Sequence, residues 1–363
     1  MLQGVEHADL WGILNGDIDT LPGSIQIRSN AREYFSRGFE LGLVAEMQTG
    51  NTSHEIEIGL RLHEDEEDRL QRNSSYHQEG GQLFLDDLGL LGNAGNRLQE
   101  AQALAVFIHD RIELNRLVLT PGLRFEDIDQ KRTRWETRSG RTSDPASRAA
   151  SNFRDSRENH TRVWLPGIGL LYDLNDRTTL VAGVHKGFTA PSNSPNVDEE
   201  EAINYELGFR FGGSRITAEA IYFLSDYNNL LGECTASSGS DCTIGDAFNG
   251  DAATVQGVEM MFSADLVSGR SFSLPLSLNY TYIKSRFDSD IADTDFFGAV
   301  DKGDPIPYIP EHQLNVSLGV EKDRWSSYVN LSYVDEVCVK ASCGAFEKTD
   351  AALVLDVTAH YAF

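Results

Sequence analysis

The chain has 363 residues and a formal net charge of −25, with 31 lysines and arginines against 56 aspartates and glutamates. This negative charge argues against nucleic acid as a partner, because phosphate binding requires a basic surface. Hydrophobic residues make up 40% of the chain and the mean hydropathy is −0.34. No uncharged run reaches the ~18 apolar residues that a membrane-spanning helix needs. The composition is compatible with a membrane β-barrel, because the strands of such a barrel are apolar only at every second position.

The first 31 residues carry little pattern, and we predict a weakly ordered loop with at most one short residual strand. From Arg32 onward, apolar residues alternate strictly with polar or small ones. Phe39, Leu41 and Leu43 share one face, with polar or small residues between them. Such alternation predicts β-strands rather than helices. The same pattern recurs in segments near 55–63, 101–113, 115–131, 161–174, 178–189, 204–211, 215–227, 253–265, 271–286, 311–322, 325–337 and 351–363.

The closing segment is the clearest strand. Leu353, Leu355, Val357 and Tyr361 lie at period two, and the chain stops on Phe363 in the same row. An outward apolar row that ends in aromatic residues is typical of a membrane barrel, whose rims carry aromatic girdles.

The connections alternate between short turns and long polar segments, as in outer-membrane barrels with periplasmic turns and external loops. An odd count of about thirteen antiparallel strands cannot close one barrel without breaking this alternation. We therefore expect an all-β, antiparallel transmembrane β-barrel portion of about 13–14 strands. The segments predicted to be external lie near 64–100, 131–161, 189–202, 228–252, 287–310 and 338–350.

Several short motifs in order resemble the C-terminal half of TonB-dependent outer-membrane receptors, and the ferric dicitrate receptor branch is the most similar. They are Leu119–Glu126, Gly187–Ser192, Asn204–Arg210, Val255–Glu259, Pro307–Asn315, Ser332–Glu336 and Leu355–Tyr361.

The resemblance implies a 22-stranded barrel filled by an N-terminal plug, with a TonB-box peptide in the periplasm. Such receptors bind iron chelates, for example an iron–siderophore or ferric citrate, and draw energy from the TonB–ExbB–ExbD complex. Residues 32–363 match only the C-terminal portion of that barrel. We therefore expect a fragment without plug, TonB box and about nine strands. The N-terminus also lacks the basic and apolar regions of a secretory signal.

The segment 131–161 is basic within an acidic chain. Its arginines could hold carboxylates of an anionic chelate in bidentate fashion. The alternatives are contact with lipopolysaccharide phosphates among the outer-membrane lipids, or a solvated loop that balances acidic neighbours. The candidate ligand-binding residues are Arg132, Arg134, Arg138, Arg141 and Arg148.

Two cysteine pairs, Cys234 with Cys242 and Cys338 with Cys343, lie in polar segments. Their spacing does not fit a zinc site, so we expect disulfides in an oxidising compartment and no resident metal or cofactor. The acidic run 64–68 is a candidate calcium site or a solvated charge run.

No catalytic motif is recognisable, so we expect no enzyme. The leading hypothesis is an outer-membrane receptor for TonB-dependent uptake of an iron chelate. The alternatives are a passive porin-like channel of about 14 strands, complete as given, and a surface protein used for adhesion.

Overall fold

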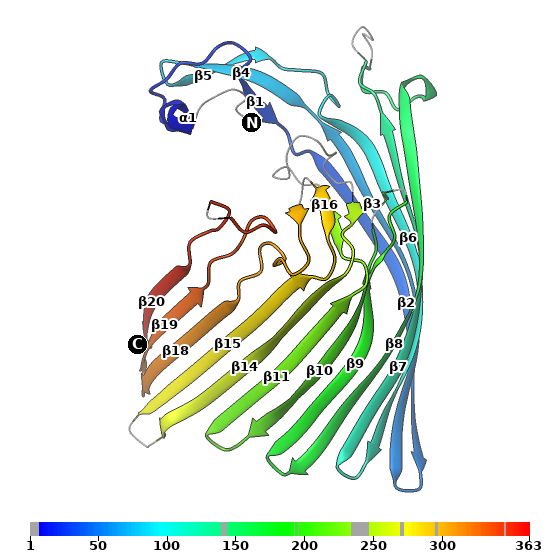
Figure 1. The fold of residues 1–363 in the computed structure, drawn as a ribbon, viewed down its shortest axis with the longest axis vertical. Helices are drawn as coiled ribbons and strands as arrows, with labels where there is room; N and C mark the ends of the chain where they lie inside the picture. The colour runs from blue at the N-terminus through cyan, green and yellow to red at the C-terminus, as the bar shows by residue number, and fades with distance from the viewer. Residues whose placement is uncertain are drawn as a thin grey trace. The chain divides into compact units, whose positions relative to one another are not determined.

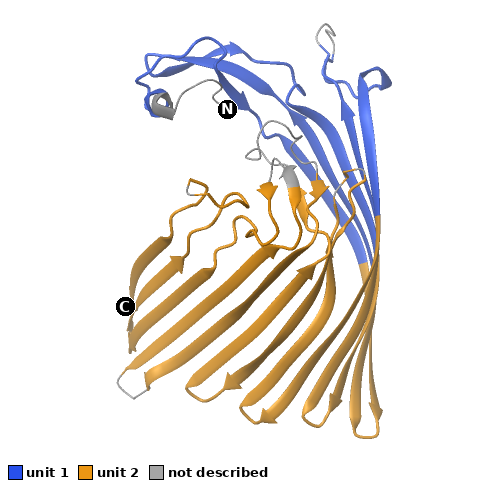
Figure 2. Ribbon diagram, in the orientation of Figure 1, with its two compact units in different colours: residues 1–39, 61–104, 128–160 blue, residues 40–60, 105–127, 161–363 orange. Residues whose placement is uncertain are grey.

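The computed structural model describes residues 7–138, 144–191, 193–194, 196–233, 247–268, 272–294, 297–344 and 346–363. The chain divides into two compact units (Figure 2). Unit 1 holds residues 1–39, 61–104 and 128–160, and unit 2 holds 40–60, 105–127 and 161–363. Among the described residues, no helix is both long and apolar enough to cross a membrane.

Strands dominate the chain in the order that the alternation predicts (Figure 1). The elements are α1 His7–Leu14, β1 Ile25–Arg28, β2 Arg32–Thr49, β3 Thr52–Gln71, β4 Asn73–Glu79, β5 Gln82–Asp87, β6 Gly95–Leu114, β7 Leu117–Trp135, η1 Ala150–Asn152, β8 Phe153–Asn175, β9 Thr178–Thr189, β10 Glu200–Gly212, β11 Ile216–Tyr227, β12 Leu231–Glu233, β13 Ala247–Asn249, β14 Ala253–Ser268, β15 Ser273–Phe287, β16 Ile291–Thr294, β17 Gly298–Val300, β18 His312–Lys322, β19 Trp325–Val334 and β20 Ala352–Tyr361.

One sheet of 13 strands has the order β2-β3-β6-β7-β8-β9-β10-β11-β14-β15-β18-β19-β20. Neighbouring strands from β8 to β20 pair antiparallel. This confirms the predicted all-β class and the count of about thirteen strands. Tight turns join alternate pairs, and at two of them a residue other than glycine takes a positive φ, Asn115 at 54° and Asp323 at 50°. Asparagine and aspartate tolerate this left-handed conformation better than most residues.

The two faces of the sheet in unit 2 differ as the alternation predicts. Val258 pairs with Tyr282, and Leu318 pairs with Val329, all on one apolar face. On that face Leu207 is 62% exposed and Leu318 is 44% exposed. The opposite face carries small and polar residues, including the hydrogen-bonded pair Ser332 and Asn315. An exposed apolar face suits contact with lipid, and a polar face suits a wet interior.

The strands near the N-terminal end of the sheet are about twice as long as those at its C-terminal end. β3 and β6 have 20 residues each, β7 has 19 and β8 has 23. β18, β19 and β20 have 11, 10 and 10. About 9–11 residues suffice to cross a membrane, so the long strands continue well beyond it.

The loop boundaries predicted near 64–100 and 131–161 are therefore wrong. β3 continues to Gln71, β6 begins at Gly95, β7 continues to Trp135 and β8 begins at Phe153. The apolar period disappears where both faces of a strand meet water, although backbone pairing continues. A prediction based on apolar alternation consequently ends each strand too early.

The external connections of unit 2 share a small apolar core around Phe287 and Phe297, whose rings lie 5.0 Å apart. Cys338 and Cys343 form a disulfide in the last connection. Between them lies Ala341, which is fully buried in the core and donates its backbone N–H to Phe297. Cys234 and Cys242 lie outside the described residues.

The first segment contains α1, which the sequence pattern does not predict, and β1. β1 pairs with β4 and β4 with β5 in a separate three-stranded sheet. These residues belong to unit 1.

Candidate anion-binding site

Four arginines lie near the ends of adjacent long strands in unit 1. Arg32 begins β2, Arg69 lies close to the end of β3, Arg97 close to the start of β6, and Arg132 close to the end of β7. The strands β2, β3, β6 and β7 are consecutive in the sheet. These residues, with Glu67 of β3, form what we call the arginine cluster.

Like charges outnumber opposite charges around Arg97. Glu67 accepts hydrogen bonds from Arg69, one of them at 3.2 Å, and lies 3.7 Å from Arg32. The charge of Arg97 interacts unfavourably with Arg69, Arg132 and Arg32, and favourably with Glu67. Counted over these five side chains alone, four arginines and one glutamate give a formal charge of +3. Crowded like charges of this kind are relieved by a bound anion.

The cluster is also poorly solvated. Arg132 is fully buried, and the side chains of Arg69 and Glu67 are 18% and 17% exposed. Ionic hydrogen bonds gain strength where water is scarce, because the effective dielectric constant falls. An anion held here would therefore be bound more strongly than one at an open surface.

Buried polar atoms lie beside the cluster. Gln99 follows Arg97 by two residues and Gln130 precedes Arg132 by two, so each glutamine shares a strand face with its arginine. The Arg97 Nε and both glutamine Oε1 atoms are buried and make no hydrogen bond within the described part of the chain. Buried polar atoms normally have a partner, so a ligand with both donors and acceptors would suit this region.

The structure describes four of the five arginines predicted as ligand residues, and most of them pair with acidic side chains. Arg134 also lies in β7 and donates to Asp155 at 2.8 Å. Arg138 lies 3.5 Å from Glu136. Arg148 binds Asp68 and Asn96 and lies over the ring of Trp135. Arg141 lies outside the described residues. Of the five, the structure places Arg132 in the arginine cluster, and the placement of Arg132 and Arg134 in a loop is wrong.

Sequence analysis missed Arg32, Arg69 and Arg97. Two of them fell in or beside a segment predicted to be a loop, and none is close to Arg132 in the sequence. The signal that could have found them is the register between strands, which single-sequence alternation does not supply.

The acidic run 64–68 lies in β3 and faces basic side chains. Glu64 accepts a hydrogen bond from Arg37 at 2.7 Å, and Asp65 lies 3.3 Å from His63. Glu67 and Asp68 contact arginines as described above. Four of the five carboxylates thus have a basic neighbour, so the run is better explained as part of an ion-pair network than as a calcium site.

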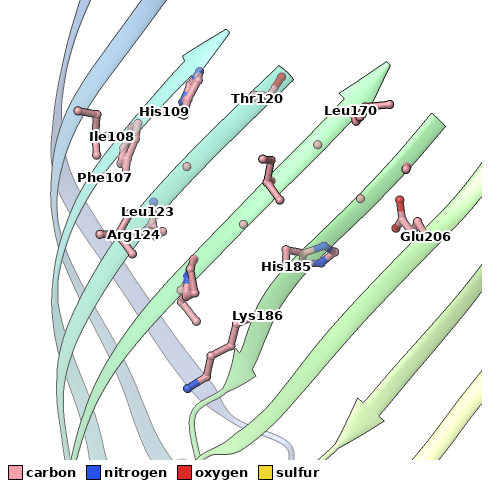
Figure 3. A pocket seen from close by; sticks show the side chains of 18 of the residues that line it. Phe107, Ile108, His109, Thr120, Leu123, Arg124, Leu170, His185, Lys186 and Glu206 are labelled. Carbon is pink, nitrogen blue, oxygen red and sulfur yellow. The ribbon is translucent and has the colours of Figure 1, made fainter. Parts of the chain in front are cut away.

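A second candidate is a hollow of about 580 Å³ on the wall of unit 2 (Figure 3). It crosses β6 to β10, where Gly122, Gly167, Gly169 and Gly183 leave the wall without side chains. A Cβ at Gly167 would lie only 3.0 Å from the Cβ of His185. The hollow therefore depends on glycine at this position.

The charged groups around this hollow are mostly paired. His109 lies 3.5 Å from Glu57, and Arg124 donates to Glu126 at 2.6 Å. Arg124 also lies over the ring of Phe107, 5.5 Å from its centre. The hollow thus presents no excess of one charge, and the arginine cluster is the stronger candidate for an anionic ligand.

Comparison with known families agrees with this architecture. The model of the TonB dependent receptor-like β-barrel matches residues 6–363. The chain belongs to this family. It is accordingly an outer-membrane protein with an antiparallel transmembrane β-barrel fold.

Curated relatives of the chain are receptors of Pseudomonas aeruginosa. The chain is 25% identical over 360 residues to the metal-pseudopaline receptor CntO, covering 91% of this chain and 46% of the receptor. It is 25% identical over 260 residues to the ferric enterobactin receptor PirA, covering 62% and 29%. The chain spans half or less of the length of these receptors.

Solved structures show the same fold. The ferric citrate transporter FecA in its unliganded form aligns with a TM-score of 0.69 and 20% identity, over 93% of this chain and 48% of that one. The ferric-catecholate import receptor Fiu of E. coli K12 aligns with a TM-score of 0.66 and 14% identity, over 91% and 48%.

Proposed function

We propose that this chain is the barrel part of a TonB-dependent receptor that takes up an anionic metal chelate. Ferric citrate is the leading candidate, and another anionic siderophore complex is the alternative. The observation that carries the proposal is the arginine cluster, where Arg32, Arg69 and Arg132 surround Arg97 and Glu67 pairs with Arg32 and Arg69. Arginine presents a planar fork of donors that matches a carboxylate in bidentate geometry.

Family membership supports transport over the other functions considered. Relatives are described as receptors for metal-pseudopaline and ferric enterobactin, and one structural neighbour as a ferric citrate transporter. In this proposal the energy comes from the TonB–ExbB–ExbD complex. A porin-like channel would need no charged cluster, and it predicts that liposomes containing the chain swell in small sugars.

A charge series of ligands tests the proposal. The chain in detergent micelles would be titrated with ferric citrate and with a neutral ferric hydroxamate, and binding followed by tryptophan fluorescence. We expect ferric citrate to bind at least about tenfold more tightly, and the difference to shrink with salt, because salt screens the exposed part of the attraction. Equal affinity for the neutral chelate would refute the anionic class.

A further inference from the structure

A strip of aromatic and basic residues runs along the outward face of β15. Tyr280, Tyr282, Lys284 and Arg286 follow one another at two-residue steps, so their side chains share one face. Tyr282 pairs with Val258 on β14 and with His312 on β18, which places the strip on the apolar, lipid-facing side of unit 2.

The tyrosines mark the outer boundary of the apolar band. The Tyr280 hydroxyl bonds His312 Nδ1 at 2.8 Å, and the Tyr282 ring lies 5.2 Å from the imidazole. β18 has 11 residues from His312 to Lys322, about 33 Å along the strand. At a tilt of about 45° this spans roughly 24 Å of membrane, close to the height of the apolar band in outer-membrane barrels. Lys322 and its cross-strand partner Trp325 then mark the inner boundary.

Lys284 and Arg286 consequently lie in the headgroup layer. They are two and four residues past Tyr282, about 7 Å and 13 Å along the strand, or roughly 5 Å and 9 Å beyond the boundary at the same tilt. The headgroup region is about 5–8 Å deep on each side of the hydrocarbon core, so Lys284 lies within it and Arg286 lies at its outer edge.

Lys284 and Arg286 differ in their hydrogen bonding. Lys284 is exposed and makes no hydrogen bond or ion pair with the residues that the structure describes. Arg286 donates from Nε to Asp288 at 2.9 Å, and Asp288 also accepts a hydrogen bond from Thr254. Asp288 fixes the guanidinium and offsets part of its charge. A further carboxylate, Asp226, lies opposite Thr254 in the register of β11 and β14.

We propose that Lys284 and Arg286 bind a phosphate group of a phosphorylated glycolipid in the outer leaflet, with Tyr280 and Tyr282 packing against the acyl chains below it. Charge complementarity and depth carry the proposal: an ammonium and a positioned guanidinium lie at the level of the lipid phosphates. Aromatic residues are typical of the interface just beneath. The site is independent of the chelate, because it lies on the lipid-facing side of the sheet.

The test uses the full chain in detergent micelles and measures retention of bisphosphorylated lipid A by native mass spectrometry. We expect K284Q/R286Q to bind about thirtyfold more weakly, because each basic group near a lipid headgroup contributes about 1 kcal/mol, or about fivefold. The single variant K284Q should lose the larger share. K322Q, on the same face at the inner boundary, is the matched control and should bind like the unchanged chain.

Two further arms separate phosphate recognition from acyl-chain binding and from loss of the fold. Lipid A without phosphates should bind weakly to both the unchanged chain and K284Q/R286Q. K284R/R286K keeps both charges and should bind as the unchanged chain does, with the same β-sheet circular dichroism. The proposal is overturned if K284Q/R286Q retains full binding, or if K284R/R286K folds but loses it. It is also overturned if inorganic phosphate displaces the lipid at equal concentration.

Discussion

Arg97 on β6 and the fully buried Arg132 on β7 lie close enough for their like charges to repel one another. Desolvation of an ion costs several kcal/mol, and a like charge in the same region adds to that cost. Glu67, whose charge interacts favourably with Arg97, also pairs with Arg32 and Arg69. The arrangement is costly for folding and useful for holding an anion.

The first prediction concerns stability. Replacing Arg97 with glutamine removes a like-charge contact, so the free energy of unfolding in urea should stay constant or rise by up to about 1 kcal/mol. Arg148→Gln is the contrasting variant, because it removes hydrogen bonds to Asp68 and Asn96 and should cost about 1–3 kcal/mol. A larger loss for Arg97→Gln than for Arg148→Gln would show that Arg97 is a structural ion-pair residue.

The second prediction concerns Gly59 in β3. The ring of Phe107 covers this glycine so closely that an added Cβ would overlap it. Gly59→Ala should therefore destabilise the chain by about 1–3 kcal/mol through overpacking. Unfolding in urea measures the loss.

A double-mutant cycle gives this prediction its control. In the Phe107→Ala background, Gly59→Ala should cost little, because the obstructing ring is gone. Gly212→Ala is the matched single variant, since a Cβ there meets nothing within 4 Å. Additive costs in the cycle would contradict the proposed contact.

The third prediction concerns the apolar core of the external connections. Phe287 is 0% exposed, and its ring packs edge-on against Phe297. Phe287→Ala should cost about 3–5 kcal/mol and accelerate hydrogen exchange in residues 297–311 and 335–344. Phe209, 41% exposed on the apolar face, provides the control. If Phe209→Ala accelerated exchange in these connections equally, the connections would not share a core.

The fourth prediction concerns pH. Hydrogen bonds from the Ser342 hydroxyl at 2.6 Å and the Gly344 N–H at 3.0 Å lower the pKa of Glu347 below its ordinary 4.5. A carboxylate whose pKa is lowered in the folded state stabilises the loop at pH values above its ordinary, unfolded pKa. This stabilisation is lost as the pH falls through the lowered, folded-state pKa. The hydrogen bond to Glu336 raises the pKa of Lys348. The stabilisation that this contact gives is therefore lost only at strongly alkaline pH.

Exchange of the Val339 amide reports on this loop, because it donates to the Glu347 carbonyl at 2.7 Å. Its protection, corrected for intrinsic exchange, should fall as the pH drops below 4.5. In Glu347→Gln this acid-dependent loss should vanish. An unchanged acid profile in the variant would assign the effect to another group.

Much of the fold could be predicted from the sequence, because lipid on one side of a strand enforces a strict alternation. The alternating residues Leu314, Val316 and Leu318 predict β18, and the short turn at Asp323 predicts that β18 pairs with β19. Where strands leave the membrane, both faces are polar and the alternation carries no apolar signal. For that reason the outer half of β3, with Glu67 and Arg69, is not predicted as a strand from the sequence.

The candidate site was predictable only in part for the same physical reason. A local excess of arginine pointed to Arg132, but three of its neighbours come from strands that are remote in sequence. Their convergence depends on strand order and register, which require pairing partners to be known.

The most direct test of the account measures the dissociation constant of ferric citrate for the unchanged chain, for Arg97→Gln and for Arg138→Gln. Arg138 is the matched control, because its half-exposed side chain lies beside Glu136 outside the cluster. One lost charge-assisted hydrogen bond of about 1.5–3 kcal/mol predicts roughly 10- to 150-fold weaker binding for Arg97→Gln. Arg138→Gln should bind as the unchanged chain does. Equal affinity of Arg97→Gln and the unchanged chain would contradict the arginine cluster as the anion-binding site.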